Sequence, residues 1–494
     1  MTPTDTASGM VSGLLDWLAS PPPPTIAEEL AQLRRQLDAL ALPGIAPQQH
    51  HRCIELFGAR ALRMAGELQP SLVESGLPLS RNLYTSARQL SEALITIADG
   101  FLRTLAAARN GAILPQHRLI ENLAGRGLLM LAEAQKTQGL AGGGHAHELW
   151  PHACALFAAA GPESSPIGPD EAVNSASIAF RRLLALGALQ LERFSQNELC
   201  WISTYLNHAA EQIEVGRYAP EPPTSYWYWL DPGSNAGPQA LLHAPAPEGQ
   251  DLIYFSTLPL ARLINTQLSR LEAGQQPSEL ELPRLATGVQ PQTLLQRLRT
   301  EWTQKPRRER PRSKAQYRVQ ACTGLDTFWK VLSGRDGSAK IHDWQVLNES
   351  PGGYSILHVA TGIDGLSAGM AIALRQDENA PWSLCIVRWI RNDNPLQIEL
   401  GLQLVSTGAS PVRVGFRGGR NQETRMVEAL VLPAAPELRK QPAILAPAGT
   451  YTSRRFALVS DADRVYIAQG RLLSLDMQTA CVELFQFEID PYPI

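Results

Sequence analysis

The sequence predicts a multidomain α+β protein with an N-terminal all-α helical domain, a small α/β module, an antiparallel β-barrel and a C-terminal β region. Capped helical segments follow one another up to about residue 215. Three prolines within residues 219–223 then break the pattern. From residue 315 apolar side chains recur with a period of two, which is typical of strands. Since single cores rarely exceed about 300 residues, we expect domains at residues 1–218, 219–304, 305–410 and 411–494.

The helical region begins with a T-x-x-E capping box formed by Thr25 and Glu28. Apolar residues then follow at alternating spacings of four and three, which places them on one helical stripe. A second capping box, Ser195 and Glu198, starts the final helix, which runs to about residue 215. Between them we expect helices at residues 48–68, 78–105, 117–137, 146–160 and 171–194. The domain is then either an irregular bundle or stacked helical hairpins, serving protein interaction or, alternatively, structure and oligomerisation.

The next region is predicted to be a small α/β module or an elaborate connector. Aromatic and β-branched residues indicate strands at 225–230 and 251–255, and apolar spacing indicates helices at 259–273 and 293–303. The aromatic run at 225–230 fits a buried strand better than a platform for stacking bases.

Short alternating segments predict the barrel. They follow from residue 315, with strands at 341–347, 354–359, 370–374, 384–390 and 396–405 and a helical insertion at 323–332. Glycine, asparagine, aspartate and proline at the turns suggest a small antiparallel barrel. Further strands are expected at 426–432, 443–445, 454–459, 465–475 and 481–489. They either extend the barrel or form a second β domain.

Composition argues for an ordinary cytoplasmic protein. With 44% hydrophobic and 18% charged residues and a net charge of -3, bulk attraction to nucleic acid or anionic membrane is not expected. The six cysteines are scattered, as in a reducing compartment. The N-terminus lacks the basic and apolar regions of a signal peptide, and no run of about 18 apolar residues predicts a membrane span.

Two polar segments, one before the first predicted strand of the barrel and one between two later strands, contain the candidate binding residues. Arg308 and Arg312 stand just before the first strand with three residues between them, and residues 348–353 form an N-x-S-x-x-G turn. The planar guanidinium donates paired hydrogen bonds to phosphate or to a guanine edge and stacks on bases. Asn348 and Ser350 can both donate and accept hydrogen bonds, while glycine at 352 and 353 permits positive φ and close main-chain approach.

The order R-x-x-x-R, then N-x-S-x-x-G, on a period-two barrel resembles the PilZ family over residues 308–406. The run Val387-Arg388-Trp389 and the strand over 400–404 are similar to the family's later strands. The resemblance implies a β-barrel that binds the second messenger cyclic di-GMP. It also implies that Arg308 and Arg312 hold guanine and phosphate, that Asn348 and Ser350 contact the second guanine side, and that Gly353 shapes the turn. The family more often has aspartate at the position of Asn348.

The alternative interpretation of residues 305–318 is a solvated basic linker, because they hold seven basic residues and one acidic residue. Three other signals are set aside. Ser367 lies in a G-x-S-x-G sequence but between a turn and a strand, unlike a hydrolase elbow. His145, His147 and His152 lack helical ligand spacing. Residues 417–420 contain a single RGG-like copy, which is weak evidence for RNA binding.

We therefore expect a non-catalytic cyclic di-GMP receptor without metal or cofactor, in which the barrel passes the signal to the helical domain and an unknown protein partner. Neither nucleic-acid binding nor membrane insertion is expected, and a homo-oligomer is left open. The alternative is a ligand-silent barrel in an interaction scaffold.

Overall fold

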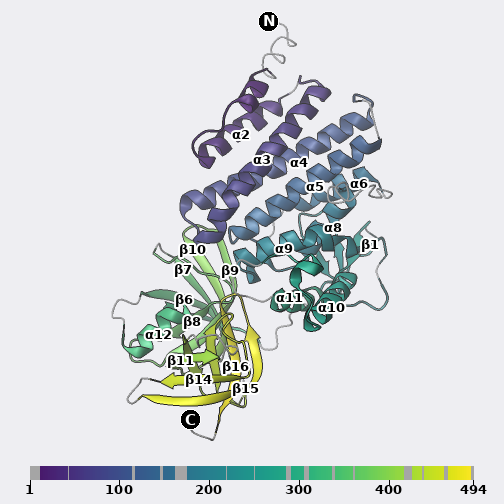
Figure 1. Cartoon of the computed structure of the whole chain (residues 1–494). Helices are drawn as coiled ribbons and strands as arrows, with labels where there is room; N and C mark the ends of the chain where they lie inside the picture. The colour runs from purple at the N-terminus through teal and green to yellow at the C-terminus, as the bar shows by residue number, and fades with distance from the viewer. Residues whose placement is uncertain are drawn as a thin grey trace.

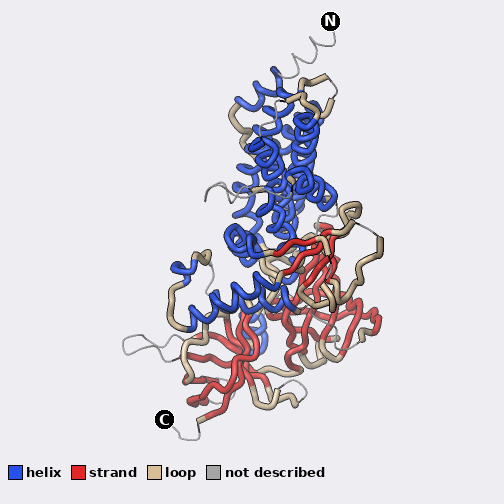
Figure 2. The backbone as a smooth tube through the Cα atoms, turned by 90° about the vertical axis from the view of Figure 1, so that its right-hand side faces the viewer, coloured by secondary structure: helices blue, strands red, loops and turns tan. Residues whose placement is uncertain are grey.

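The computed structural model describes residues 12–490 except 43, 114–116, 145–147, 162–174, 219, 250, 285–290, 305–310, 336–339, 360–361, 417–425, 437–438 and 461–464. Helices fill the upper half of the molecule and two β-barrels the lower half, with a small sheet module beside the helices (Figure 1). The view turned by 90° shows the same division between helix and strand (Figure 2). The predicted α+β class, a helical domain followed by a PilZ-like barrel, is confirmed.

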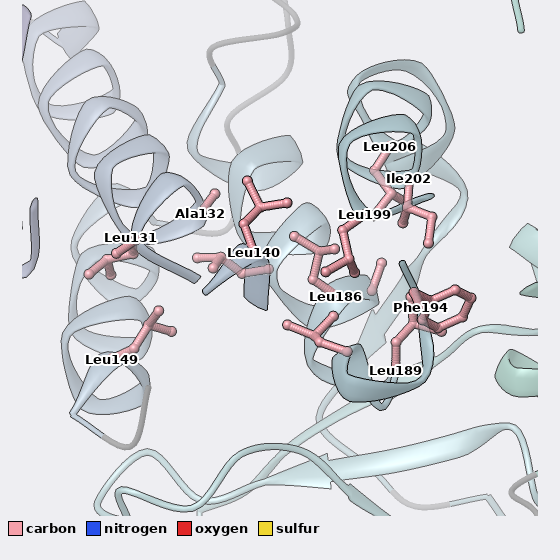
Figure 3. Packing of buried hydrophobic residues seen from close by; sticks show 14 of the residues in the cluster. Leu131, Ala132, Leu140, Leu149, Leu186, Leu189, Phe194, Leu199, Ile202 and Leu206 are labelled. Carbon is pink, nitrogen blue, oxygen red and sulfur yellow. The ribbon is translucent and has the colours of Figure 1, made fainter. Parts of the chain in front are cut away.

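Amphipathic helices form the N-terminal domain. The Thr25 side chain caps the helix that starts at Ile26 by accepting from the Glu28 N–H, and Ser195 and Glu198 make the complete capping box that the sequence predicts. Apolar faces meet in one core, which Figure 3 shows around Leu140, Leu186 and Leu199. The helices are α2 (Ile26–Leu40), α3 (Pro47–Ser75), α4 (Arg81–Arg109), α5 (His117–Leu140), α6 (Leu149–Ala160), α8 (Ala176–Gly187), η1 (Leu191–Arg193), α9 (Gln196–Ala209) and η2 (Ala210–Gln212).

A four-stranded antiparallel sheet with two helices follows, in the order β1-β4-β2-β3. Tyr228 on β2 stacks on Phe255 of β4, with ring centroids 5.2 Å apart. Strand β1 forms within the stretch expected to be helical up to residue 215, because it pairs with the distant β4. The elements are β1 (Glu214–Gly216), β2 (Trp227–Leu230), β3 (Gln239–Ala240), β4 (Ile253–Ser256), α10 (Leu258–Glu272), η3 (Pro277–Leu280) and α11 (Pro291–Thr303).

The first barrel closes in the order β10-β7-β6-β5-β8-β9. The predicted helical insertion is α12 (Leu325–Ser333), which lies between the first two strands of the barrel. The strands are β5 (Ser313–Thr323), β6 (Ile341–Ser350), β7 (Gly353–Val359), β8 (Ala371–Arg375), β9 (Ser383–Asn394) and β10 (Gln397–Ser406).

The C-terminal strands close a second barrel in the order β11-β12-β13-β16-β15-β14. Numbered within each barrel, both rings run first, second, third, sixth, fifth, fourth, so the second barrel repeats the connectivity of the first. Its opening strand β11 was not predicted. The strands are β11 (Ser410–Phe416), β12 (Val427–Leu432), β13 (Ala443–Pro447), β14 (Arg455–Ser460), β15 (Tyr466–Gln478) and β16 (Val482–Ile489).

The two barrels share a buried core. Phe328 and Trp329 of α12 pack with Leu384 of the first barrel and with Leu430 and Leu484 of the second. The Trp329 indole N–H donates to the Val412 carbonyl at 2.8 Å. Helix α12 therefore packs between the two barrels and links the second barrel to the first.

The first barrel also contacts the helical domain directly. Leu77 and Leu366 exchange two backbone hydrogen bonds of 2.9 and 2.7 Å, and the Asn392 N–H donates to the Gly142 carbonyl at 2.9 Å. A Cβ at Gly142 would fall 2.9 Å from the Asn392 Cβ, so the close approach at this joint requires glycine. Figure 1 shows β7, β9 and β10 as the strands nearest the helices.

Candidate functional site

The polar turn of the sequence motif joins β6 to β7. Ser350 and Gly353 are opposite each other in the ladder, with only Pro351 and Gly352 between them. The Ser350 hydroxyl donates to the Gly353 carbonyl at 3.3 Å, and the Leu404 N–H of β10 donates to the Gly352 carbonyl at 3.0 Å. The turn is thus fixed both internally and by the neighbouring strand.

Gly353 is the one position of the turn that excludes any side chain. Its φ is +151°, and a Cβ built there would lie 1.9 Å from the Leu402 carbonyl oxygen. A backbone oxygen cannot move away without breaking the β7–β10 ladder. Position 353 of this turn therefore requires a glycine.

Strand register brings Arg312 beside this turn. Ser313, the first residue of β5, pairs with Glu349, and Lys314 pairs with Asn348. Arg312, which is exposed, immediately precedes that pair and so lies next to the end of β6. Arg308 lies outside the described residues. Of the predicted site, the structure brings together Arg312, Asn348, Ser350 and Gly353.

Tyr317 adds a hydrogen bond that no sequence motif indicated. Its hydroxyl donates to the Glu349 carboxylate at 2.7 Å, across a bulge between Lys314 and Tyr317 in the β5–β6 ladder. Burial, followed by the hydrogen bond and negative charge of Glu349, raises the pKa of Tyr317 well above its usual range. The phenol therefore remains protonated and keeps the Glu349 carboxylate bound on the β5 side of the turn.

Asn348 carries an unsatisfied acceptor. Its Oδ1 is buried and has no hydrogen-bond partner among the residues that the structure describes. Buried polar atoms without a partner are rare in native proteins, and a ligand is one source of the missing donor. This carboxamide oxygen can accept from the N–H groups of a guanine edge.

A row of cross-strand neighbours extends from the turn across the sheet. Directly paired residues share one face of a sheet, so Asn348, Ser355, Gly401 and Trp389 follow one another across β6, β7, β10 and β9. The Ser355 hydroxyl donates to the Glu399 carboxylate at 2.8 Å. A Cβ at Gly401 would fall 2.0 Å from the Trp389 indole nitrogen, so this glycine makes room for the indole. The period-two pattern could have assigned these residues to one face, but not their cross-strand register.

The arrangement can bind an anion with aromatic or amide-bearing groups. Arg312 and Lys314 supply positive charge at one end of the row, and Asn348 and Ser350 supply amide and hydroxyl groups beside them. An arginine at such a site contributes about 1.5 to 3 kcal/mol per charge-assisted hydrogen bond.

The structure describes part of the G-x-S-x-G, histidine and RGG-like sequences. Leu366 of the G-x-S-x-G sequence pairs with Leu77, and the chain continues into β8 rather than a helix. The Ser367 side chain is hydrogen-bonded to the Cys481 thiol. Burial raises the pKa of this thiol to about 11. His152 lies 3.8 Å from Asp99, while His145, His147 and residues 417–420 are outside the described part. Within the described residues no cluster of three or more His, Cys, Asp or Glu could hold a metal.

Comparison with known proteins identifies both halves of this architecture. Residues 12–221 match the family model "Cyclic-di-GMP receptor FimW, N-terminal domain", and residues 332–411 match "Cyclic-di-GMP receptor FimW, middle PilZ domain". A curated relative, the cyclic-di-GMP receptor FimW of Pseudomonas aeruginosa, is 26% identical over 102 residues. That match covers 21% of this chain and 17% of the relative. No solved structure matches.

Among the described helices, none has the length and apolar content to cross a membrane. The middle-domain match spans β6 to β10 of the first barrel, and the N-terminal match spans the helical domain. Together the two matches cover more than half of the chain. The first barrel is therefore a PilZ-type domain, and the helical domain and this barrel are similar to the N-terminal and middle domains of the FimW cyclic-di-GMP receptors.

Proposed function

We propose that this chain binds cyclic di-GMP at the β6–β7 turn of its first barrel and transmits binding to the helical domain. The main support is the β5–β6 register, which sets Arg312 beside the turn that holds Asn348, Ser350 and Gly353. The unsatisfied Asn348 oxygen adds to it, because a ligand donor would satisfy that atom.

In this proposal each motif has its own role. Arg308 and Arg312 hold a guanine and a phosphate, since a guanidinium can donate paired hydrogen bonds to either. Asn348 and Ser350 contact the second guanine side, and Gly353 keeps the turn close to β10. The ligand would be held between a chain segment and a rigid hairpin.

Transmission to the helical domain follows from the chain connections. The arginine segment joins α11 directly to β5, so a ligand that fixes this segment also fixes α11 relative to the barrel. Glu301 of α11 pairs with Arg193 of the helical domain at 2.9 Å. Arg388 of β9 is half-buried near both, and burial together with Arg193 and Arg297 lowers its pKa to about 10. Movement of the barrel would disturb this charged cluster.

The proposal describes a receptor that acts through binding and carries out no reaction of its own. The Cys385 and Cys481 thiols have pKa values raised by burial, which disfavours the nucleophilic thiolate. Since the ligand is an intracellular second messenger, the proposed site of action is the cytoplasm.

Isothermal titration of the intact chain with cyclic di-GMP tests the proposal. We expect saturable binding that Arg308→Ala, Arg312→Ala and Asn348→Ala each weaken about tenfold or more, since about 1.4 kcal/mol corresponds to one decade. Arg318→Ala is the matched control, because it removes the same charge from an exposed position farther along β5. Absence of binding, or an equal loss in the control, would contradict the proposed site.

A second candidate function is that of a scaffold protein whose barrel binds no ligand and which acts through protein contacts alone. Asn348 favours it, because the family more often has an acceptor-only aspartate at this position. In that case a protein partner would co-purify equally with and without cyclic di-GMP, and titration would give no heat of binding.

A further inference from the structure

A separate cavity of about 980 Å³ lies between the helical domain and the first barrel. Helix α4, the ends of α5 and α8 and residues 236–239 form most of its wall. Arg391 and Asp393 of β9 form the remainder, on the barrel side. Its size is at the upper end for small-molecule pockets, which are about 300 to 1,000 Å³. We call this cavity the interdomain groove.

Small residues line the floor of the interdomain groove for a structural reason. Trp150 is fully buried beneath it, and a Cβ at Gly187 would lie 2.5 Å from its ring. A Cβ at Gly237 would lie 3.0 Å from its indole nitrogen. Gly143 and Gly144 continue the lining. A floor without side chains leaves main chain accessible, so another main chain can approach closely.

Polar groups around the groove suit an extended peptide. Gln138, Gln190 and Gln239 line it, and a carboxamide can both donate to and accept from peptide groups. The Gln239 amide donates to the Gly237 carbonyl at 2.9 Å, which leaves its oxygen as the acceptor for a peptide N–H. Gln239 belongs to β3, which pairs only with β2 among the described strands and so ends the small sheet. Edge strands are common docking positions for extended segments.

Charge determines which peptide fits. Arg88 pairs with Glu92 at 2.9 Å and Arg391 with Glu192 at 3.5 Å, so these four lining charges cancel. Glu148 and Asp393 also line the groove, and their carboxylates have no ion pair among the described residues. The remaining charge of -2 opposes an anion such as a cyclic dinucleotide and attracts cations.

We propose that the interdomain groove binds an extended segment of a partner protein that carries lysine or arginine side chains. The glycine floor admits its main chain, the glutamines hydrogen-bond to its peptide groups, and Glu148 and Asp393 receive its cations. Because both the helical domain and the barrel line the groove, the bound segment contacts both. Binding here does not require the cyclic di-GMP site, so each proposal can fail independently.

Fluorescence anisotropy with the full chain at about 0.15 M salt, where exposed charges are screened beyond roughly 8 Å, provides the test. The probes are a labelled peptide of alternating lysine and alanine and its glutamate and alanine counterpart. We expect the basic peptide to bind and the acidic one not to bind. Gly144→Trp should weaken binding about tenfold or more by filling the groove, because a Cβ there meets no atom within 4 Å and the variant should fold. Gly66→Trp, at an equally open position on α3, should bind as the wild type does.

Charge reversal separates specific binding from general attraction. Glu148→Lys combined with Asp393→Lys should also weaken binding of the basic peptide about tenfold or more. Glu248→Lys combined with Glu272→Lys makes the same change in net charge at exposed positions outside the groove and should leave it unchanged. Failure of the basic peptide to bind, retained binding in Gly144→Trp, or equal weakening by both double reversals would overturn the proposal.

Discussion

At the scale of single residues, the candidate site depends on how closely main chains approach around the β6–β7 turn. Gly353 and Gly352 are neighbours with opposite environments, since a Cβ at Gly353 would overlap the Leu402 carbonyl whereas one at Gly352 meets nothing within 4 Å. The N-x-S-x-x-G spacing predicted that a glycine shapes this turn. It could not show which atom excludes a side chain, because β10 lies far along the chain from β7.

Gly353→Ala should therefore destabilise the barrel. We expect a loss of about 2 to 4 kcal/mol in unfolding free energy, from backbone strain and displacement of β10. Gly352→Ala should remain within about 0.5 kcal/mol of the wild type, as surface substitutions usually do. Urea unfolding followed by circular dichroism measures both, and equal stability of the two variants would contradict the described packing.

His342 should make the first barrel sensitive to acid. Burial, then His358 and Lys340, lowers its pKa below the usual value of 6.5, and this outweighs Asp364 and Asp343, which act in the opposite direction. As pH falls through about 6.5 the unfolded chain takes up the proton first, so stability present above that pH is lost below it. The unfolding temperature should fall between about pH 7.5 and 5.5, and less so in His342→Gln.

The control for that experiment is His243→Gln, which removes an exposed imidazole from the small sheet module. Its unfolding temperature should decline with acid as the wild type does. An identical decline in His342→Gln would show that the acid sensitivity arises elsewhere.

At the scale of elements, local patterns predicted most helices and strands, and long-range pairing determined the rest. Helix α12 could be predicted from its composition, and its place between two barrels could not. Strand β11 was missed because Pro411 and Gly415 interrupt its pattern, while pairing with both β12 and β14 fixes it in the ring. Strand β1 was assigned to a helix because its partner β4 is distant in the sequence and gives no local signal.

In the second barrel, a buried arginine holds the connection between β12 and β13. The Arg439 guanidinium is buried and donates to the Val405 and Pro433 carbonyls and to the Ser406 hydroxyl. It thereby ties this connection to the end of β10, just before β11 begins. The equivalent places in the first barrel are the motif turn and the arginine segment.

Arg439→Ala should destabilise the pair of barrels by about 3 to 5 kcal/mol, because buried acceptors lose their donors. Arg439→Lys should be intermediate, since a lysine keeps the charge but cannot reach three acceptors with a planar fork. Cyclic di-GMP affinity, measured where the variants remain folded, should be unchanged. Lost affinity in a folded Arg439→Lys variant would contradict a binding site confined to the β6–β7 turn.

At the scale of the whole molecule, the helical domain, the small module and two barrels meet at joints that sequence periodicity could not predict. The sequence left open whether the last strands extend the first barrel or form another. Ring closure depends on pairs such as Phe416 with Phe456, which lie on strands far apart in the sequence. The Leu77–Leu366 bridge likewise joins segments that carry no local signal for each other. The candidate site could be proposed from the sequence because its residues lie within two short motifs.

In the proposed function, cyclic di-GMP binds at the β6–β7 turn of the first barrel. Hydrogen–deuterium exchange of the intact chain, with and without saturating cyclic di-GMP, would locate the bound ligand. We predict slower exchange in peptides that cover residues 347–355 and 402–404, and unchanged exchange in residues 427–432 and 443–447 of the second barrel. Protection confined to the second barrel, or no protection around Asn348 and Gly353 at saturation, would contradict it.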